Sequence, residues 1–134
     1  MILYSDEYQT IRHSAQTSML ELNWTSASSK LADTTYKTRF DNIVQFIEES
    51  KPAVLLADLQ NLIYNASYQF APLTNNLRQK LIQAGVQKLA FIKSDDTITQ
   101  LLVEQLVKKI GNHYFVTRYF DDTQTAKAWL TQVN

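Results

Sequence analysis

Ala53-Val-Leu-Leu-Ala57 is a continuously apolar stretch with the length of one β-strand, and it ends at Asp58. A strand has this composition when both of its faces are buried, as in a sheet that is covered by helices. Pro52 closes the segment before it, because proline lacks the backbone N–H that a helix interior needs. The stretch therefore predicts a central strand in a helix-covered sheet.

The segment before this strand has the pattern of an amphipathic helix. Its apolar side chains recur at positions i, i+4, i+7, i+8 and i+11, the spacing of one helical face: Tyr36, Phe40, Ile43, Val44 and Ile47. Either Asp33 or Thr34 can cap the first turn. The small, polar residues 25–30 ahead of this helix are expected to form an exposed loop.

Two strands are predicted nearer the N-terminus, at residues 8–13 and 19–24. In the second, apolar residues occupy every second position from Leu20 to Trp24, which is the period of a half-buried strand. Because the link between the two strands is short, an antiparallel hairpin is expected. Its register stays open, since the link contains no Gly or Asn-Gly turn signal.

A second helix and a further strand follow the central strand. Apolar residues at helical spacing end at Gly85, which suits the left-handed position after a helix. A strand is predicted at 86–92. Pro72 either lies in the first turn of this helix or kinks a longer helix that begins near Ser67, and the pattern leaves both readings open.

A third helix, another strand and a fourth helix complete the pattern. The third helix is capped within 94–96 and is expected to bury Ile98, Leu101, Leu102, Leu106 and Ile110. A strand at 114–120 leads to the last helix, which Asp121 or Asp122 can cap. The buried side of that helix is expected to carry Ala126, Trp129, Leu130 and Val133.

This order of elements predicts a single α/β domain over residues 1–134. Strands joined by helices are parallel neighbours linked by right-handed crossovers, and the hairpin adds antiparallel strands to the same sheet. We expect a mixed sheet with an N-terminal antiparallel hairpin followed by β/α crossovers. The strands at 53–57, 89–92 and 115–120 should be parallel neighbours within it.

The composition excludes several classes of protein. The 134 residues include 13 basic and 13 acidic ones and no cysteine, so that disulfides and thiolate metal sites are excluded. Lys and Arg are scattered rather than gathered into the basic face of a nucleic-acid binder. No stretch approaches the ~20 apolar residues of a membrane span. Asp6 and Glu7 stand where a secretory signal needs basic residues, so the cytoplasm is the expected compartment.

Three stretches resemble the STAS and SpoIIAA-like superfamily, in particular its small stand-alone STAS/SEC14-type domains. They are Val54-Leu-Leu-Ala-Asp58, Ala84-Gly-Val-Gln-Lys-Leu-Ala-Phe91, and Arg118-Tyr-Phe-Asp-Asp122 with Ala126, Ala128 and Trp129. The resemblance implies a SpoIIAA-like (STAS-like) fold. It also implies action through protein contacts, and the SEC14 likeness suggests a carrier of an apolar ligand.

The resemblance bears on phosphorylation as well. Anti-sigma-factor antagonists of that superfamily carry a phosphoacceptor serine in an Asp-Ser-Ser-Gly-type turn after the central strand. The resemblance places Ser67 at that serine and Ala66 at the acidic position, while Tyr68 and Gln69 replace the small residues that follow. Because the acid and the glycine are missing, we expect Ser67 to act as a helix cap rather than as a regulated phosphorylation site.

Other polar residues fit structural roles better than catalytic ones. Asp58 lies at the carboxyl end of the presumed central strand, where α/β folds usually bind ligands, but no second carboxylate or histidine accompanies it. Asp121 and Asp122 suit a helix start. His13 and His113 have no neighbours at metal-ligand spacing, and two glycines cannot build a phosphate-binding loop. We expect no enzyme activity, metal or cofactor.

The aromatic residues around Pro72 are the first choice for a contact. The candidates for contact or ligand binding are Asp58, Tyr64, Ser67, Tyr68 and Phe70. The leading hypothesis is a non-enzymatic, regulatory STAS-like module that contacts an unknown protein, with a homodimer as one form. The alternative is a carrier or sensor that binds a small apolar ligand or lipid between helices and sheet. An apolar cavity would favour the carrier, and an exposed apolar patch the contact module.

Overall fold

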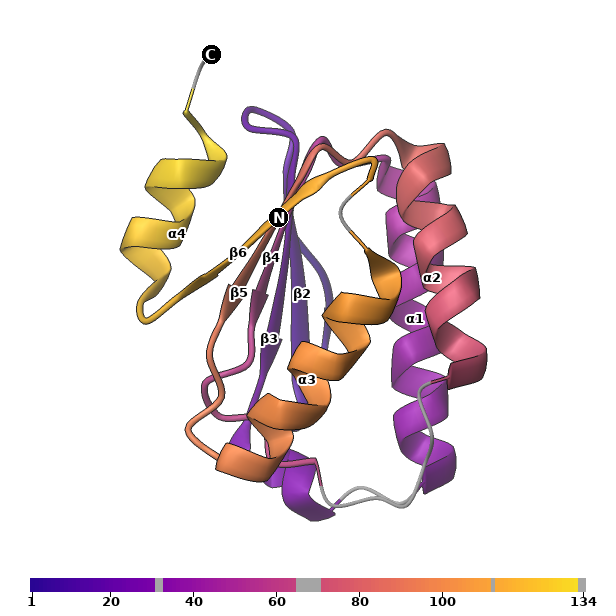
Figure 1. The fold of residues 1–134 in the computed structure, drawn as a ribbon, viewed down its shortest axis with the longest axis vertical. Helices are drawn as coiled ribbons and strands as arrows, with labels where there is room; N and C mark the ends of the chain where they lie inside the picture. Colours follow the sequence, from indigo (N-terminus) through magenta and orange to yellow (C-terminus); the bar gives the residue numbers. More distant parts are fainter. Residues whose placement is uncertain (31–32, 65–70, 112, 133–134) are drawn as a thin grey trace.

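The computed structural model of the chain describes residues 1–30, 33–64, 71–111 and 113–132 and has an α/β fold (Figure 1). Six strands form one mixed sheet, in which spatial neighbours follow the order of the sequence. The strands are β1 (Ile2–Ser5), β2 (Gln9–Ser14), β3 (Met19–Trp24), β4 (Val54–Asp58), β5 (Lys88–Ile92) and β6 (Val116–Phe120). The fold class predicted from the sequence is confirmed.

The N-terminal strands are antiparallel, and the later strands are parallel. β2 and β3 form the predicted hairpin in the register that pairs Ile11 with Leu22. β3 then runs parallel to β4, β4 to β5, and β5 to β6, as strands joined by helical crossovers do. The prediction that β4, β5 and β6 are parallel neighbours in one sheet is therefore confirmed.

Three helices cover one face of the sheet, and a fourth covers part of the other face (Figure 1). α1 (Asp33–Ser50), α2 (Ala71–Ala84) and α3 (Thr97–Ile110) each connect two neighbouring parallel strands. Because these strands follow one another in order, right-handed crossovers place all three helices on the same face. α4 (Thr123–Leu130) packs against β4, β5 and β6 from the other side. Within the described ranges, no helix has both the length and the apolarity that crossing a membrane requires.

The central strands β4 and β5 contribute side chains to two hydrophobic cores, one on each face of the sheet. Leu55 and Leu89 are buried in the core beneath α1, α2 and α3. Leu56 and Ala90, on the alternate positions, are buried in the smaller core beneath α4. Both faces of β4 are thus covered, which is the physical reason for the uninterrupted apolar sequence at 53–57.

Trp129 is half-buried, whereas the sequence predicted that it would be buried at the centre of the α4 face. Lys88 Nζ and the guanidinium carbon of Arg118 lie 5.2 and 5.5 Å from its ring centres. The fully covered residues of α4 are Ala126 and Leu130, so Trp129 lies at the margin of that face. Val133, also predicted for this side, lies outside the described residues.

The strand β1 was not predicted. It is only four residues long, and its pairing with β2 shifts register between Ile2 and Tyr4. The regular alternation that reveals a strand in a sequence is therefore missing.

The segment predicted to be an exposed loop at 25–30 forms a short 3₁₀ helix, η1 (Ser26–Lys30). Ser28 within it is completely buried. Its carbonyl oxygen accepts a hydrogen bond from the Tyr36 hydroxyl at 2.6 Å, and its Oγ accepts one from the Ile63 amide at 3.1 Å. The prediction was wrong for Ser28, because these two partners draw a small polar residue into the interior.

The helix boundaries at Pro72 and Gly85 follow backbone chemistry. The structure begins α2 at Ala71, so that Pro72 falls in the first turn, where its missing N–H costs nothing. Gly85 has a φ of 82°, and the Val86 amide donates to the Leu81 carbonyl at 3.1 Å. The predicted left-handed stop is thus confirmed.

Candidate functional site

Asp58 ends β4 at the carboxyl edge of the parallel strands, where the sequence predicted it. Its Oδ1 accepts a hydrogen bond from the Gln60 amide at 3.1 Å, and its register neighbours are Asn23 of β3 and Ile92 of β5. Across the described part of the chain, no group of three or more acidic or histidine side chains could hold a metal ion. Asp58 therefore orders the loop that follows it, and its two sheet neighbours offer no acid or base.

Tyr64, one of the candidate contact residues, is a core residue with 7% of its surface exposed. Its ring centre lies 4.7 Å from that of Tyr36, and its amide donates to Thr99 Oγ1 at 2.8 Å. Tyr64 is therefore too deeply buried to meet a partner directly. The remaining candidates lie outside the described residues and stay predictions: Ser67, Tyr68 and Phe70.

Buried hydroxyl groups fasten the loop after β4 to the start of α3. Ser94 Oγ donates to the Leu62 carbonyl at 2.8 Å. Thr99 Oγ1, besides accepting from the Tyr64 amide, donates to Asp96 Oδ2 at 2.7 Å. These hydroxyl groups at the carboxyl edge of the sheet bond to other groups of the same chain, and they hold the loop in place.

Asp96 and Asp122 are helix caps, as predicted for the paired acids. Asp96 Oδ2 accepts from the Thr99 amide at 2.9 Å, and Asp122 Oδ1 accepts from the Thr125 amide at 2.7 Å. Hydrogen bonds lower the pKa of both carboxyls. The bond from the Thr99 hydroxyl has the largest effect on Asp96, and the bond from the Thr125 amide has the largest effect on Asp122. Both caps are therefore ionised at neutral pH, so that neither can act as a general acid.

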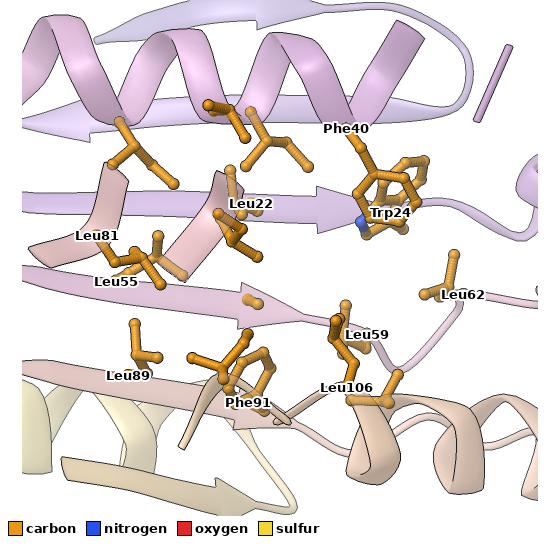
Figure 2. Close-up of a pocket in the computed structure, with 17 residues that line it drawn as sticks. Leu22, Trp24, Phe40, Leu55, Leu59, Leu62, Leu81, Leu89, Phe91 and Leu106 are labelled. Atoms are coloured by element: carbon orange, nitrogen blue, oxygen red, sulfur yellow. The ribbon is translucent and has the colours of Figure 1, made fainter. Parts of the chain in front are cut away.

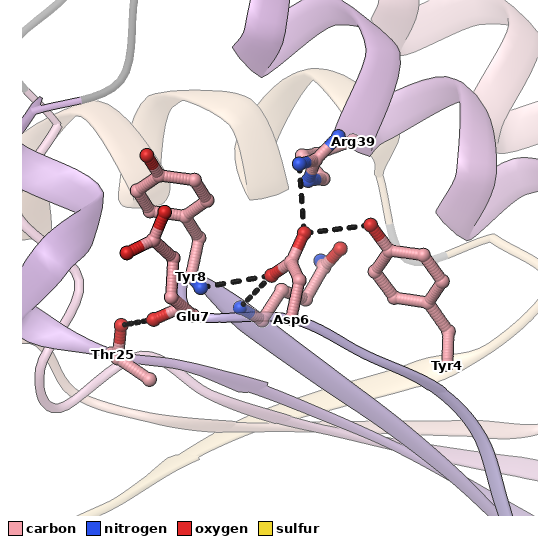
Figure 3. A network of polar contacts seen from close by, with 7 residues as sticks. Tyr4, Asp6, Glu7, Tyr8, Thr25 and Arg39 are labelled. Carbon is pink, nitrogen blue, oxygen red and sulfur yellow. Dashed lines mark hydrogen bonds and ion pairs between the residues drawn. The ribbon is translucent and has the colours of Figure 1, made fainter.

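Asp6, in the turn between β1 and β2, is the centre of a polar network that the sequence analysis missed (Figure 3). Its Oδ2 accepts from the Tyr4 hydroxyl at 2.6 Å and lies 2.7 Å from Arg39 Nη2. Its Oδ1 accepts from the amides of Tyr8 and Gln9, each at 2.8 Å. The guanidinium carbon of Arg39 lies 5.8 Å from the ring centres of both Tyr4 and Tyr8. The network joins α1 to the turn between β1 and β2.

The electrostatics of this network keep Asp6 charged. Burial by itself raises the pKa of Asp6, but the hydrogen bonds from Tyr4, Tyr8 and Gln9 and the charge of Arg39 together lower it below the ordinary value. The bond to Asp6 also raises the pKa of the Tyr4 hydroxyl. An ionised acid with its acceptor positions occupied is suited to holding two elements together rather than to proton transfer.

An apolar cavity of about 90 Å³ lies between the sheet and the three helices on its covered face. Figure 2 shows side chains from β3, β4 and β5 gathered around it, together with Phe40 of α1, Leu81 of α2 and Leu106 of α3. Every residue that lines it is hydrophobic. Tyr64, a candidate for ligand binding in the sequence analysis, is not among its lining residues. Among the described lining residues no side chain is charged or carries a hydroxyl or carboxamide group, and the indole of Trp24 has the one polar side-chain group.

The outward side of α3 is the second feature that the sequence analysis did not foresee. We define the outer α3 face as Ile98, Leu101, Gln105 and Lys108, four exposed residues at the spacing of one helical stripe. Ile98 and Leu101 are 68% and 57% exposed, which corrects the prediction that they are buried. Thr99 and Val103 face the interior in their place, and Ile110 is buried as predicted. α3 (orange in Figure 1) therefore carries apolar side chains on its exposed side as well as on its buried side.

Comparisons with known proteins leave the family open. A scan against family models and searches of curated proteins and of solved structures found no match to this chain. The likeness to STAS and SpoIIAA-like domains accordingly stays a proposal that rests on the residues quoted above.

Proposed function

We propose that this chain is a non-enzymatic, STAS-like regulatory module that acts through protein contacts, with the outer α3 face as its contact surface. The observation that carries the proposal is the exposure of Ile98 and Leu101 on a helix whose other side lies in the core. Ile98 and Leu101 are three residues apart on this helix, so their side chains lie next to each other on its surface. Neighbouring exposed apolar side chains of this kind are typical of contact surfaces.

The polar residues near the strand ends support binding rather than catalysis. Asp58, Asp96 and Asp122 accept hydrogen bonds from the backbone of the loop or helix that follows each of them. A catalytic pair would need a nucleophile and a base in mutual contact.

A cytoplasmic location, expected from the sequence, remains part of the proposal.

Capture of partners from the cell that produces the protein tests the contact surface. Leu101→Glu places a charge at the centre of the outer α3 face. Val116→Glu is the matched control, since Val116 of β6 is 56% exposed and Leu101 57%. The wild type and Val116→Glu should retain the same partner, and Leu101→Glu should lose it. If both variants retain that partner equally, the outer α3 face is not the contact surface.

The contact is proposed to be independent of phosphorylation at Ser67. Ser67→Ala should therefore leave partner capture unchanged, and peptide mass spectrometry of the protein from its own cell should find no phosphate at that serine. A partner that binds only the phosphorylated form would instead restore the partner-switching mechanism of the anti-sigma-factor antagonists.

A second candidate function is the binding of a small apolar molecule, and the cavity favours it. At about 90 Å³ the cavity is well below the roughly 300 to 1,000 Å³ of drug-sized pockets. A whole lipid does not fit, and the described lining residues offer a head group no charged or hydroxyl partner. The class of ligand is thus a compact, uncharged hydrocarbon or a gas.

Xenon is a suitable probe, because apolar cavities in proteins bind it. Under xenon pressure, the methyl resonances of Val103 and Leu106 should shift and saturate, while those of Leu56, in the core beneath α4, should not. Ala57→Leu, which extends a lining side chain into the cavity, should abolish the shifts. Equal shifts in that variant would exclude the cavity as the site.

A further inference from the structure

Opposite charges stand at the two ends of the outer α3 face. Asp95 immediately precedes the N-cap of α3, and Lys108 lies in its last turn. Leu101 is six residues after the first and seven before the second. Both charged side chains are exposed, and neither forms an ion pair with another residue in the described ranges of its own chain.

Such a surface is complementary to a copy of itself that runs in the opposite direction. With Leu101 beside Leu101 of the second copy at a two-fold axis, Asp95 of each copy faces Lys108 of the other. Ile98 then packs on Gln105 of the second copy. A two-fold contact uses the same patch on both molecules, and antiparallel helices bring opposite ends of their dipoles together.

We infer that the outer α3 face binds a second copy of this chain in this antiparallel arrangement. The inference rests on the proposed function, since it names the partner of the same surface. One helix face buries less than the ~800 Å² per partner of a standard interface. The dissociation constant should therefore lie above about 1 µM.

Val116, an apolar position with nearly the same exposure as Leu101, does not offer this complementarity. Val116 lies on the edge strand β6, whose central residue is Arg118. Two β6 edges that pair in antiparallel fashion about their centres set Arg118 against Arg118 of the second copy. Like charges directly opposite each other destabilise such a pair.

Sedimentation velocity of the full chain, from about 10 µM to about 1 mM, tests the inference. The wild type should show a reversible shift from monomer to dimer. Leu101→Glu should raise the dissociation constant at least about tenfold, because two like charges meet at the axis. Val116→Glu should leave it unchanged. Circular dichroism and equal unfolding midpoints establish that both variants fold.

Charge exchange tests the antiparallel register. Asp95→Lys and Lys108→Asp should each weaken the dimer by about threefold to tenfold, and the double variant should restore it. A double variant that is no better than the single ones overturns the register. A wild type that is monomeric at about 1 mM overturns the second copy as partner. The proposed function is then judged separately, by the capture of another protein with Leu101→Glu.

Discussion

Arg39 Nη2 lies 2.7 Å from Asp6 Oδ2, and this ion pair joins α1 to the turn between β1 and β2. The two side chains are only 16% and 22% exposed. The pair Lys37–Asp41 on the same helix, by contrast, is 59% and 49% exposed at 3.3 Å. Water screens the second pair far more than the first, so the two pairs should contribute differently to stability.

Asp6→Ala should lower the free energy of unfolding by about 1 to 3 kcal/mol, because it leaves the half-buried Arg39 and two backbone amides without their acceptor. Asp41→Ala, which removes the exposed pair, should cost less than about 0.5 kcal/mol. Urea denaturation of both variants measures the difference. Equal losses would mean that the Asp6 network is as solvated as the surface pair.

The same carboxylate predicts a pH dependence. Since the pKa of Asp6 is lower in the folded chain than its ordinary value of about 3.8, the unfolded state binds the proton first as the pH falls. The stabilisation is therefore complete above the unfolded pKa and is lost as the pH falls through the folded pKa. The stability gap between the wild type and Asp6→Asn should close between about pH 5 and pH 2. A gap that is constant over this range would refute the lowered pKa.

The cavity and the smaller core predict opposite outcomes for the same substitution. Ala57 lines the cavity, so Ala57→Val places two methyl groups in free space and should stabilise the chain by about 1 kcal/mol. Ala90 is completely buried on the other face of the sheet, in the core with Ala126 and Leu130. Ala90→Val should overpack this core and cost about 1 to 3 kcal/mol. Thermal unfolding of the two variants should shift in opposite directions.

The half-buried position of Trp129 sets the cost of removing it. A fully buried tryptophan costs about 3 to 5 kcal/mol on replacement by alanine. Because part of the Trp129 ring meets solvent and the charges of Lys88 and Arg118, Trp129→Ala should cost about 1 to 3 kcal/mol. Chemical denaturation measures this, with Leu130→Ala as the control. Leu130 is 4% exposed, and its loss should cost about 2 to 5 kcal/mol.

The elements that were predictable from the sequence are those with one clear period. The unbroken apolar run of β4 and the single stripe of α1 each admit one arrangement. α3 does not, because apolar residues at Ile98, Leu101 and Val103 span more of its circumference than one buried stripe. The spacing alone could not tell which side faces the sheet. That breadth was itself a signal of an exposed apolar face.

Long-range contacts account for the other features that the sequence did not reveal. Ser28 is buried because Tyr36 and Ile63 donate to it, and Ile63 is 35 residues away. The Asp6 network needs Arg39 from a helix that starts beyond the hairpin. The cavity depends on how side chains from three strands and three helices fit together. Local periodicity carries no information on such pairings.

Gln9 offers the sharpest test of the interior. It is completely buried, and neither atom of its side-chain amide has a hydrogen-bond partner in the described part of the chain. An amide buried without partners costs free energy, and an apolar group of the same shape removes that cost. Gln9→Met should therefore raise the free energy of unfolding by about 1 to 3 kcal/mol.

The control is Gln45, which lies on the exposed side of α1 and whose amide donates to Glu49 at 3.0 Å. Gln45→Met should change stability by less than about 0.5 kcal/mol. A loss of stability in Gln9→Met would show that an ordered water satisfies the amide in solution, and that the polar side chain is retained for that bond.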